Sequence, residues 1–213
     1  ITDCRAAGPW SRLCPGKKWA DEITPGLVVG DPVYLEGRAW HGGPSRLGLD
    51  WGTLRGALAD HGYTTLSVQM PVLTSEAGAE EYPSTFDEAG DRLKVAVDFL
   101  RTKGYQKLGI VSHSMGSRMT HYYLTRDPGT PTNAWICIGW GGEDDVSQLP
   151  LPVLDLYGEK DLPAVLQGAK RRAASIHSSN RSQQIMAPKA DHFFTNQQAE
   201  LVKYVREFLD KLF

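Results

Sequence analysis

Long hydrophobic runs are missing from this sequence of 213 residues. A helix that crosses a bilayer needs about 20 consecutive apolar residues, and no run approaches that length, so we expect no membrane span. Charge of one sign is also scarce, because the formal net charge is only -2. Electrostatics therefore give no reason to expect nucleic acid or an anionic membrane surface as a partner.

Metal and cofactor motifs are missing as well. No group of Cys, His and Asp residues has the spacing of metal ligands, and neither a G-x-G-x-x-G nor a P-loop pattern occurs. We find no internal repeat, low-complexity tract or second core. A content of 41% hydrophobic and 23% charged residues is typical of a soluble globular protein. These features predict one domain over residues 26–213, with no metal and no organic cofactor.

Cysteine is scarce, with three residues in the chain. Cys137 lies in an apolar run and is predicted to be buried in the core. Cys4 and Cys14 lie in residues 1–25, a Pro- and Gly-rich leader without periodicity that we expect to wrap the domain surface as coil. A disulfide between them would tie down this leader and would indicate a periplasmic or secreted protein. The first residue is Ile rather than Met, as expected of a processed or trimmed N-terminus. Two free thiols, and a cytoplasmic protein, are the alternative.

Strand and helix patterns alternate along the rest of the chain. Short apolar runs predict strands, and apolar residues at helical spacing predict helices. The expected strands are 27–29, 32–35 (after a turn at Gly30 and Asp31), 63–70, 108–111, 133–138, 153–157 and 183–186. The expected helices are 50–62 (capped by Asp50), 86–103, 115–126, 162–177 and a last helix capped by Thr195. This alternation predicts an α/β fold, a doubly wound, mostly parallel sheet of six to eight strands with helices on both faces.

The segment Ser112-His113-Ser114-Met115-Gly116 follows the apolar run at 108–111. It matches the nucleophile-elbow pattern G-x-S-x-G, except that the first small residue is Ser. A sharp turn between strand and helix strains its central residue and needs small neighbours. Such a turn would expose the hydroxyl of Ser114 and place the N–H of Met115 at a helix N-terminus, where it can stabilise an oxyanion.

A serine nucleophile needs a base, and the base needs a group that orients it. In doubly wound sheets these groups lie on loops beyond the carboxyl ends of strands. The loop after strand 153–157 offers Asp161 and, less well, Glu159, and the loop after strand 183–186 offers His192. The chain order Ser114, Asp161, His192 is that of α/β-hydrolase triads. Each residue alone has a simpler explanation, since Asp161 could only cap a helix and His192 could only lie on the surface.

The other histidines are weaker candidates for the base. His113 is expected to pack under the elbow, while the remaining three, His61, His121 and His177, lie on helices or near their ends. His41 follows the expected strand 32–35 and should border the site. We expect it either to face the substrate or to brace its own loop.

From about residue 26 onward the chain resembles the α/β-hydrolase superfamily. The motifs that carry the resemblance are Ser112-His113-Ser114-Met115-Gly116, Leu156-Tyr157-Gly158-Glu159-Lys160-Asp161 and Ala190-Asp191-His192-Phe193. The layout, including residues 65–73, is similar to small bacterial carboxylesterases and dienelactone hydrolases. One departure concerns the oxyanion loop, which usually reads His-Gly in the family and here reads Glu36-Gly37. The N–H of Arg38 is the expected second oxyanion donor, because a backbone donor depends on loop shape more than on side-chain identity.

These features together predict a serine hydrolase of carboxylic esters, with a small-molecule ester as substrate. Only residues 139–152 separate two strands where a lid domain would be inserted, so we expect an open site for short to medium acyl chains. Aromatic walls from Trp40, Trp140 and Phe193 are the expected acyl-binding surface. A thioesterase with the same triad is one alternative, and a catalytically silent binding fold, motivated by Ser112 and Glu36, is another. We expect a monomer or a weak homodimer.

Overall fold

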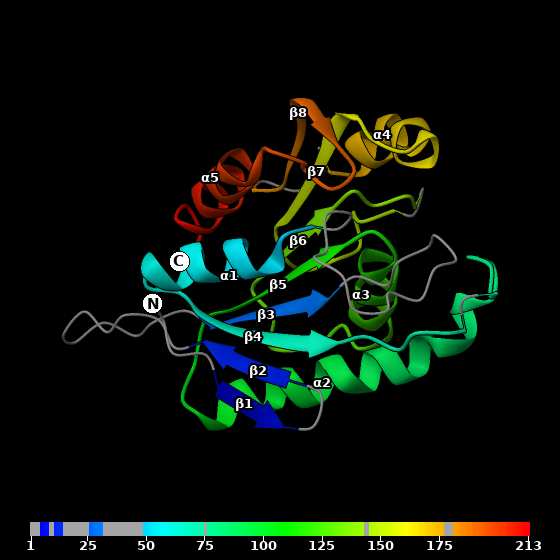
Figure 1. Cartoon of the computed structure of the whole chain (residues 1–213). Helices are drawn as coiled ribbons and strands as arrows, with labels where there is room; N and C mark the ends of the chain where they lie inside the picture. The colour runs from blue at the N-terminus through cyan, green and yellow to red at the C-terminus, as the bar shows by residue number, and fades with distance from the viewer. Residues whose placement is uncertain are drawn as a thin grey trace.

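One sheet runs through the centre of the molecule and carries helices on both faces (Figure 1). The computed structural model describes the backbone of residues 5–8, 11–14 and 26–31, and residues 49–74, 76–142, 145–176 and 181–213. Within these residues, the strands are β1 (Arg5–Gly8), β2 (Ser11–Cys14), β3 (Gly26–Asp31), β4 (Thr64–Gln69), β5 (Leu108–His113), β6 (Ala134–Ile138), β7 (Val153–Lys160) and β8 (Gln183–Asp191). The helices are α1 (Trp51–Asp60), α2 (Phe86–Thr102), α3 (Met115–Arg126), α4 (Pro163–Ile176) and α5 (Gln198–Leu209), with a 3₁₀ turn η1 (Tyr82–Thr85) before α2.

The strand order is β1-β2-β4-β3-β5-β6-β7-β8. All neighbours from β4 to β8 are parallel, whereas β1 and β2 are antiparallel to each other and β2 is antiparallel to β4. The predicted doubly wound, mostly parallel sheet is therefore confirmed. Parallel strands bring all their carboxyl ends to one edge of the sheet, which is where loops carrying functional residues meet.

The first part of the chain differs from our expectation. Two segments of the leader that we predicted as coil are the strands β1 and β2, because β2 finds its hydrogen-bonding partner in β4, far along the chain. The expected turn at Gly30 and Asp31 is also wrong, since β3 runs through both residues beside β4. The predicted strand 32–35 and the predicted Cys4–Cys14 disulfide lie outside the residues whose side chains are described.

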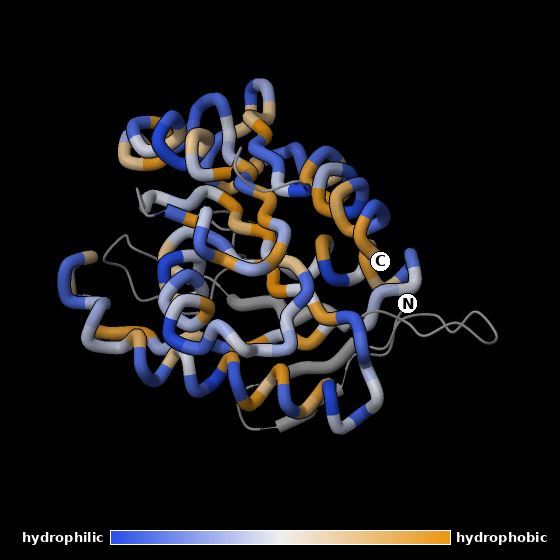
Figure 2. Tube along the Cα trace, turned by 180° about the vertical axis from the view of Figure 1, so that it is seen from behind, coloured by the Kyte–Doolittle hydropathy of each residue, from blue (hydrophilic) through white to orange (hydrophobic). Residues whose placement is uncertain are grey.

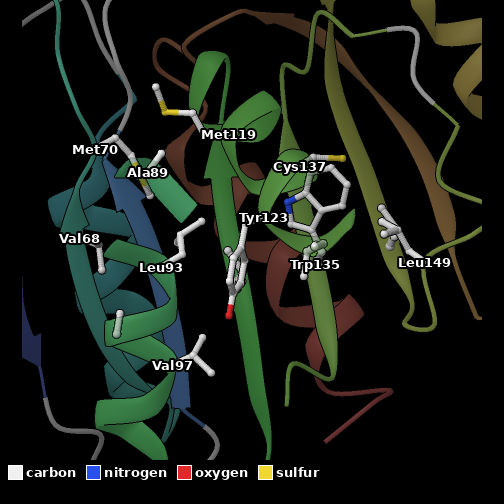
Figure 3. Packing of buried hydrophobic residues seen from close by; sticks show 14 of the residues in the cluster. Val68, Met70, Ala89, Leu93, Val97, Met119, Tyr123, Trp135, Cys137 and Leu149 are labelled. Atoms are coloured by element: carbon white, nitrogen blue, oxygen red, sulfur yellow. The ribbon is translucent and has the colours of Figure 1, made fainter. Parts of the chain in front are cut away.

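Two apolar layers enclose the sheet, as the alternation along β6 shows. Trp135 and Cys137 point into a core shared with α2 and α3, while Ala134, Ile136 and Ile138 point into a core shared with α1 and α5. In the first core, Leu93 and Val97 of α2 pack beside Tyr123 of α3 (Figure 3). Hydrophobic residues recur along the central strands, whereas the helices alternate between hydrophobic and hydrophilic residues (Figure 2). This pattern is expected of strands buried on both faces and of helices with one face in water.

Helix ends confirm one capping prediction and contradict another. The side chain of Asp50 accepts the N–H of Thr53 at 2.9 Å and caps α1 as predicted. Thr195 does not cap the last helix, because α5 begins at Gln198 with Gln197 at its N-cap. The N–H of Thr195 instead bonds to the carboxylate of Asp191 in the preceding turn.

The connection between β6 and β7 packs against the body of the protein. Val146, Leu149 and Leu151 are buried in the core that contains α2 and α3. No lid domain is built there, which agrees with the predicted fold class. None of the helices in the described part of the chain has the length and apolar character that a bilayer crossing requires.

Candidate active site

The turn between β5 and α3 has the geometry of a nucleophile elbow. Ser114 stands between the last residue of β5 and the first residue of α3, with φ 53° and ψ -122°. A positive φ is strained for a residue with a Cβ atom. The turn is held by the N–H of Ser114, which donates to the carbonyl oxygen of Ile138 at 2.9 Å. The serine hydroxyl therefore stands at the carboxyl edge of the sheet.

The unusual Ser112 fits this turn and has a partner. A Cβ atom at Gly116 would lie 4.0 Å from the Cβ of Ser112, which is an ordinary van der Waals contact, so the side chain of Ser112 fits beside the start of α3. The hydroxyl of Ser112 accepts the indole N–H of Trp135 at 2.9 Å and lies 3.3 Å from the hydroxyl of Ser117. The serine thus satisfies a buried indole donor that a glycine would leave unpaired.

The register of β7 and β8 brings Asp161 next to His192. Lys160 pairs with Asp191 beyond a bulge, and the two functional residues directly follow this pair. Gly158 is needed at the bulge, because a Cβ atom there would lie 2.4 Å from the carbonyl oxygen of Ala190. The carboxylate of Asp161 is buried and accepts the N–H of Gly158 at 3.0 Å and that of Leu162 at 2.8 Å.

Three side chains form a chain of hydrogen bonds. His192 Nδ1 lies 2.6 Å from Asp161 Oδ1, and His192 Nε2 lies 3.0 Å from Ser114 Oγ. A carboxylate accepts only, so Nδ1 carries the proton and Nε2 is free to accept the proton of the serine hydroxyl. This is the arrangement in which histidine can act as a general base toward serine.

A tight turn over residues 191–195 contains His192 and fixes its backbone. The carboxylate of Asp191 accepts the N–H groups of Phe193 at 3.0 Å and of Thr195 at 2.9 Å. Burial raises the pKa of Asp191, but these hydrogen bonds outweigh it, so the pKa lies below its usual range. Phe194 follows with a φ of 53° and a fully buried ring, so the turn also stores backbone strain.

The alternative acid Glu159, and Asp145 on the β6–β7 connection, have other hydrogen-bond partners. Glu159 lies in β7 rather than in the loop after it, and its carboxylate accepts the N–H of Lys189 of β8 at 2.7 Å. Asp145 accepts the N–H of its near neighbour Ser147 at 2.7 Å. Among the described carboxylates, Asp161 is therefore the one bonded to His192. No group of three or more potential metal ligands occurs in the described part of the chain.

The predicted oxyanion and substrate residues are only partly described. Met115 is the first residue of α3, where N–H groups have no partner within the helix. Phe193 lies beside the triad, with its ring centroid 5.0 Å from that of His192. Arg38, Trp40 and His41 lie outside the described residues.

Trp140 was predicted to line an open acyl-binding groove, but its side chain is buried in the core. Its ring is fully buried, with centroids 5.2 Å from Trp135 and 5.3 Å from His121. The guanidinium of Arg172 lies 5.7 Å from its centroid. The ring turns into the core because Gly139, with φ 55°, redirects the chain after β6.

Two further contributors to the site were missed as such by the sequence analysis. A Cβ atom at Gly139 would lie 2.8 Å from His192 Nδ1, so only glycine leaves room for the imidazole. Leu162, which directly follows Asp161, and Leu166, in the first turn of α4, are exposed and add apolar surface to this part of the chain. A glycine after a buried strand was a usable signal for the first contributor, whereas the two exposed leucines gave no such signal.

Comparison with solved structures shows the same fold in known hydrolases. A serine hydrolase without a lid from Xanthomonas campestris is 16% identical, with a TM-score of 0.69 and coverage of 99% of this chain and 94% of that chain. A dienelactone hydrolase from Anabaena variabilis is 18% identical, with a TM-score of 0.67 and coverage of 100% and 97%. The esterase domain of a Rhodothermus marinus protein is 14% identical, with a TM-score of 0.62 and coverage of 93% and 90%.

No protein-family model and no curated protein matches the sequence. At identities of 14% to 18% the structural likeness shows the fold alone. The chain has the α/β-hydrolase fold, and the described residues between β6 and β7 build no lid domain.

Proposed function

We propose that the protein is a serine hydrolase that cleaves carboxylic esters. The observation that carries the proposal is the hydrogen-bonded chain from Ser114 through His192 to Asp161, at 3.0 Å and 2.6 Å. The structural neighbours support it, since they include a serine hydrolase, a dienelactone hydrolase and an esterase domain.

In the proposed reaction, Ser114 Oγ attacks the acyl carbon of the ester while its proton passes to His192 Nε2. The imidazolium is stabilised by Asp161, whose carboxylate is held by two backbone N–H groups. The N–H of Met115 stabilises the oxyanion of the tetrahedral intermediate, together with the predicted second donor at Arg38. The imidazolium then gives its proton to the leaving alcohol. Water activated by His192 attacks the acyl-enzyme, releases the acid and restores Ser114.

Short acyl groups fit the proposed site best. The β6–β7 connection packs into the core, and the ring of Trp140 is buried with it. The acyl group is then left with open surfaces such as Phe193 and Leu162. Each buried CH₂ contributes about 0.8 kcal/mol, so kcat/KM should rise with chain length only until these surfaces are covered. In a series of p-nitrophenyl esters we expect a maximum at about two to six carbons, and a steady rise to sixteen would contradict the open site.

The test of the function is labelling and turnover with a matched variant. The wild-type protein should react with a fluorophosphonate probe and hydrolyse p-nitrophenyl butyrate. Ser114→Ala should lose labelling and about 10⁶-fold in kcat while keeping its fold by circular dichroism. Ser117→Ala is the control, because Ser117 is a buried serine one helical turn further on that does not contact His192. A wild-type protein that is folded but neither labels nor hydrolyses oxygen esters or thioesters would favour a silent binding fold.

A further inference from the structure

His113 makes close contacts to the proposed base from the other side of the nucleophile turn. It is the last residue of β5 and is almost fully buried. Its Nε2–H donates to the backbone carbonyl oxygen of His192 at 2.8 Å, and the two imidazole centroids are 4.5 Å apart. The carbonyl oxygen can only accept, so the proton of His113 is on Nε2.

The hydrogen bond from His113 to His192 connects the ends of two strands, β5 and β8, that are not neighbours in the sheet. β8 is separated from β5 by β6 and β7, and neighbouring strands lie about 4.8 Å apart, which places the two strands about 14 Å apart. The chain after β8 must therefore reach back across the sheet edge before His192 can meet Ser114. Asp161 orients the imidazole from the β7 side, and the His113 bond ties the backbone of the same residue to the strand that carries the nucleophile.

An apolar side chain would fill the position of His113 at a lower energetic cost than a histidine. Its Nδ1 is buried without a hydrogen-bond partner among the described residues, and a buried unpaired polar atom costs about 1–3 kcal/mol. Burial, followed by the nearby His192, lowers the pKa of His113 to about 3, while Asp161 acts in the opposite direction. The ring is thus neutral beside His192, where a second positive charge would oppose the imidazolium formed during the reaction.

We propose that His113 is a positioning residue, whose Nε2–H bond to the His192 carbonyl and whose ring contact hold the base within hydrogen-bonding distance of Ser114. The proposal rests on the proposed hydrolase function and adds a residue outside the triad to its machinery. His113 touches neither the reacting oxygen nor, in the proposed reaction, the substrate, and it acts through His192 alone.

Two variants separate the hydrogen bond from the packing. His113→Gln places an amide donor close to the position of Nε2 and keeps the bond, whereas His113→Leu keeps apolar volume and removes the donor. Turnover is measured per site titrated with the fluorophosphonate probe, so that a loss of folded protein does not count as a loss of activity. We expect His113→Leu to lose roughly 10²-fold in kcat with little change in KM, and His113→Gln to recover most of that loss.

A second measurement does not depend on turnover. The proton between His192 Nδ1 and Asp161 should give a low-field NMR resonance, which should persist in His113→Gln and shift or broaden in His113→Leu. If the wild-type protein hydrolyses no ester, the proposed function fails and this resonance alone decides the positioning. Equal kcat per titrated site and an unchanged resonance in His113→Leu would overturn the proposal, as would a His113→Gln variant no better than His113→Leu.

Discussion

At the scale of single residues, the nucleophile turn combines backbone strain at Ser114 with a paired hydroxyl at Ser112. Ser114 adopts a positive φ, while the hydroxyl of Ser112 pairs with the indole of Trp135. The departure from glycine at position 112 is therefore compatible with the elbow geometry. Backbone strain of this kind persists only where the surrounding structure holds it in place.

The choice between Asp161 and Glu159 can be tested with one isosteric change at each position. Asp161→Asn should lower kcat by about 10⁴-fold, because a neutral amide no longer stabilises the imidazolium or holds the correct tautomer. Glu159→Gln should have a much smaller effect, since the amide oxygen can still accept the N–H of Lys189. Steady-state kinetics on one short ester compare the two variants. A larger loss in Glu159→Gln would assign the acid to Glu159 instead.

At the scale of elements, helix α4 is attached to the sheet by a buried ion pair. Arg172 is fully buried and its Nε donates to Asp155 of β7 at 2.8 Å, while Nη1 donates to the carbonyl of Gly142 at 2.9 Å. Gln184 of β8 donates to the same carboxylate oxygen at 2.8 Å. These bonds join α4, β7, β8 and the loop after β6, which are the elements that surround the Asp161 side of the site.

Removal of this arginine should destabilise the protein strongly. Arg172→Met leaves the carboxylate of Asp155 buried without its ionic partner, and breaking such a pair typically costs about 3–5 kcal/mol. Urea unfolding followed by circular dichroism measures the loss. Lys170→Met removes a positive charge at a nearby exposed position of the same helix and should alter stability by about 0.5 kcal/mol or less. Equal effects of the two substitutions would show that the buried pair contributes no more than an exposed cation.

The sequence predicted the elements that carry the triad better than those that brace it. Ser114, Asp161 and His192 each follow an apolar run, so strand ends located them. The burial of Trp140 was not predictable in this way, because the strand pattern ends before it and the backbone turns at Gly139 with a positive φ. The hydrogen bond of His113 has its acceptor 79 residues away along the chain. The strands β1 and β2 likewise depend on pairing with the distant β4. Neither feature can be predicted from the residues near it in the sequence.

At the scale of the whole molecule, the buried His113 predicts a loss of stability in mild acid. In an unfolded chain histidine has a pKa of about 6.5, whereas in the folded protein burial lowers the pKa of His113 to about 3. Below about pH 6.5 the unfolded chain therefore binds a proton that the folded protein does not. The free energy of unfolding then falls by at most about 1.4 kcal/mol per pH unit. His113→Gln should lose less stability than the wild type between about pH 7 and about pH 5 in urea titrations.

Two buried or half-buried carboxylates also change the stability with pH, and they act in opposite directions. The pKa of Asp191 lies below its usual range, so its contribution to stability is lost as the pH falls below about 4. Burial raises the pKa of Asp155 despite Arg172, so this group favours the folded state as the pH falls toward about 4. Neither residue is altered in His113→Gln, and a variant whose stability falls as steeply as that of the wild type would contradict the assignment to His113.

The order of β5, β6, β7 and β8 along one side of the sheet is also their order in the chain. Ser114 and His192 are 78 residues apart, and Asp161 and His192 are 31 apart. During synthesis the strained serine turn and the acidic loop can therefore form while the histidine is still to be made. Until β8 takes its place beside β7, the growing chain holds a nucleophile with no group to activate it. A protein built in this order would acquire its reactivity only when β8 joins the sheet, after the strand and turn of the nucleophile are in place.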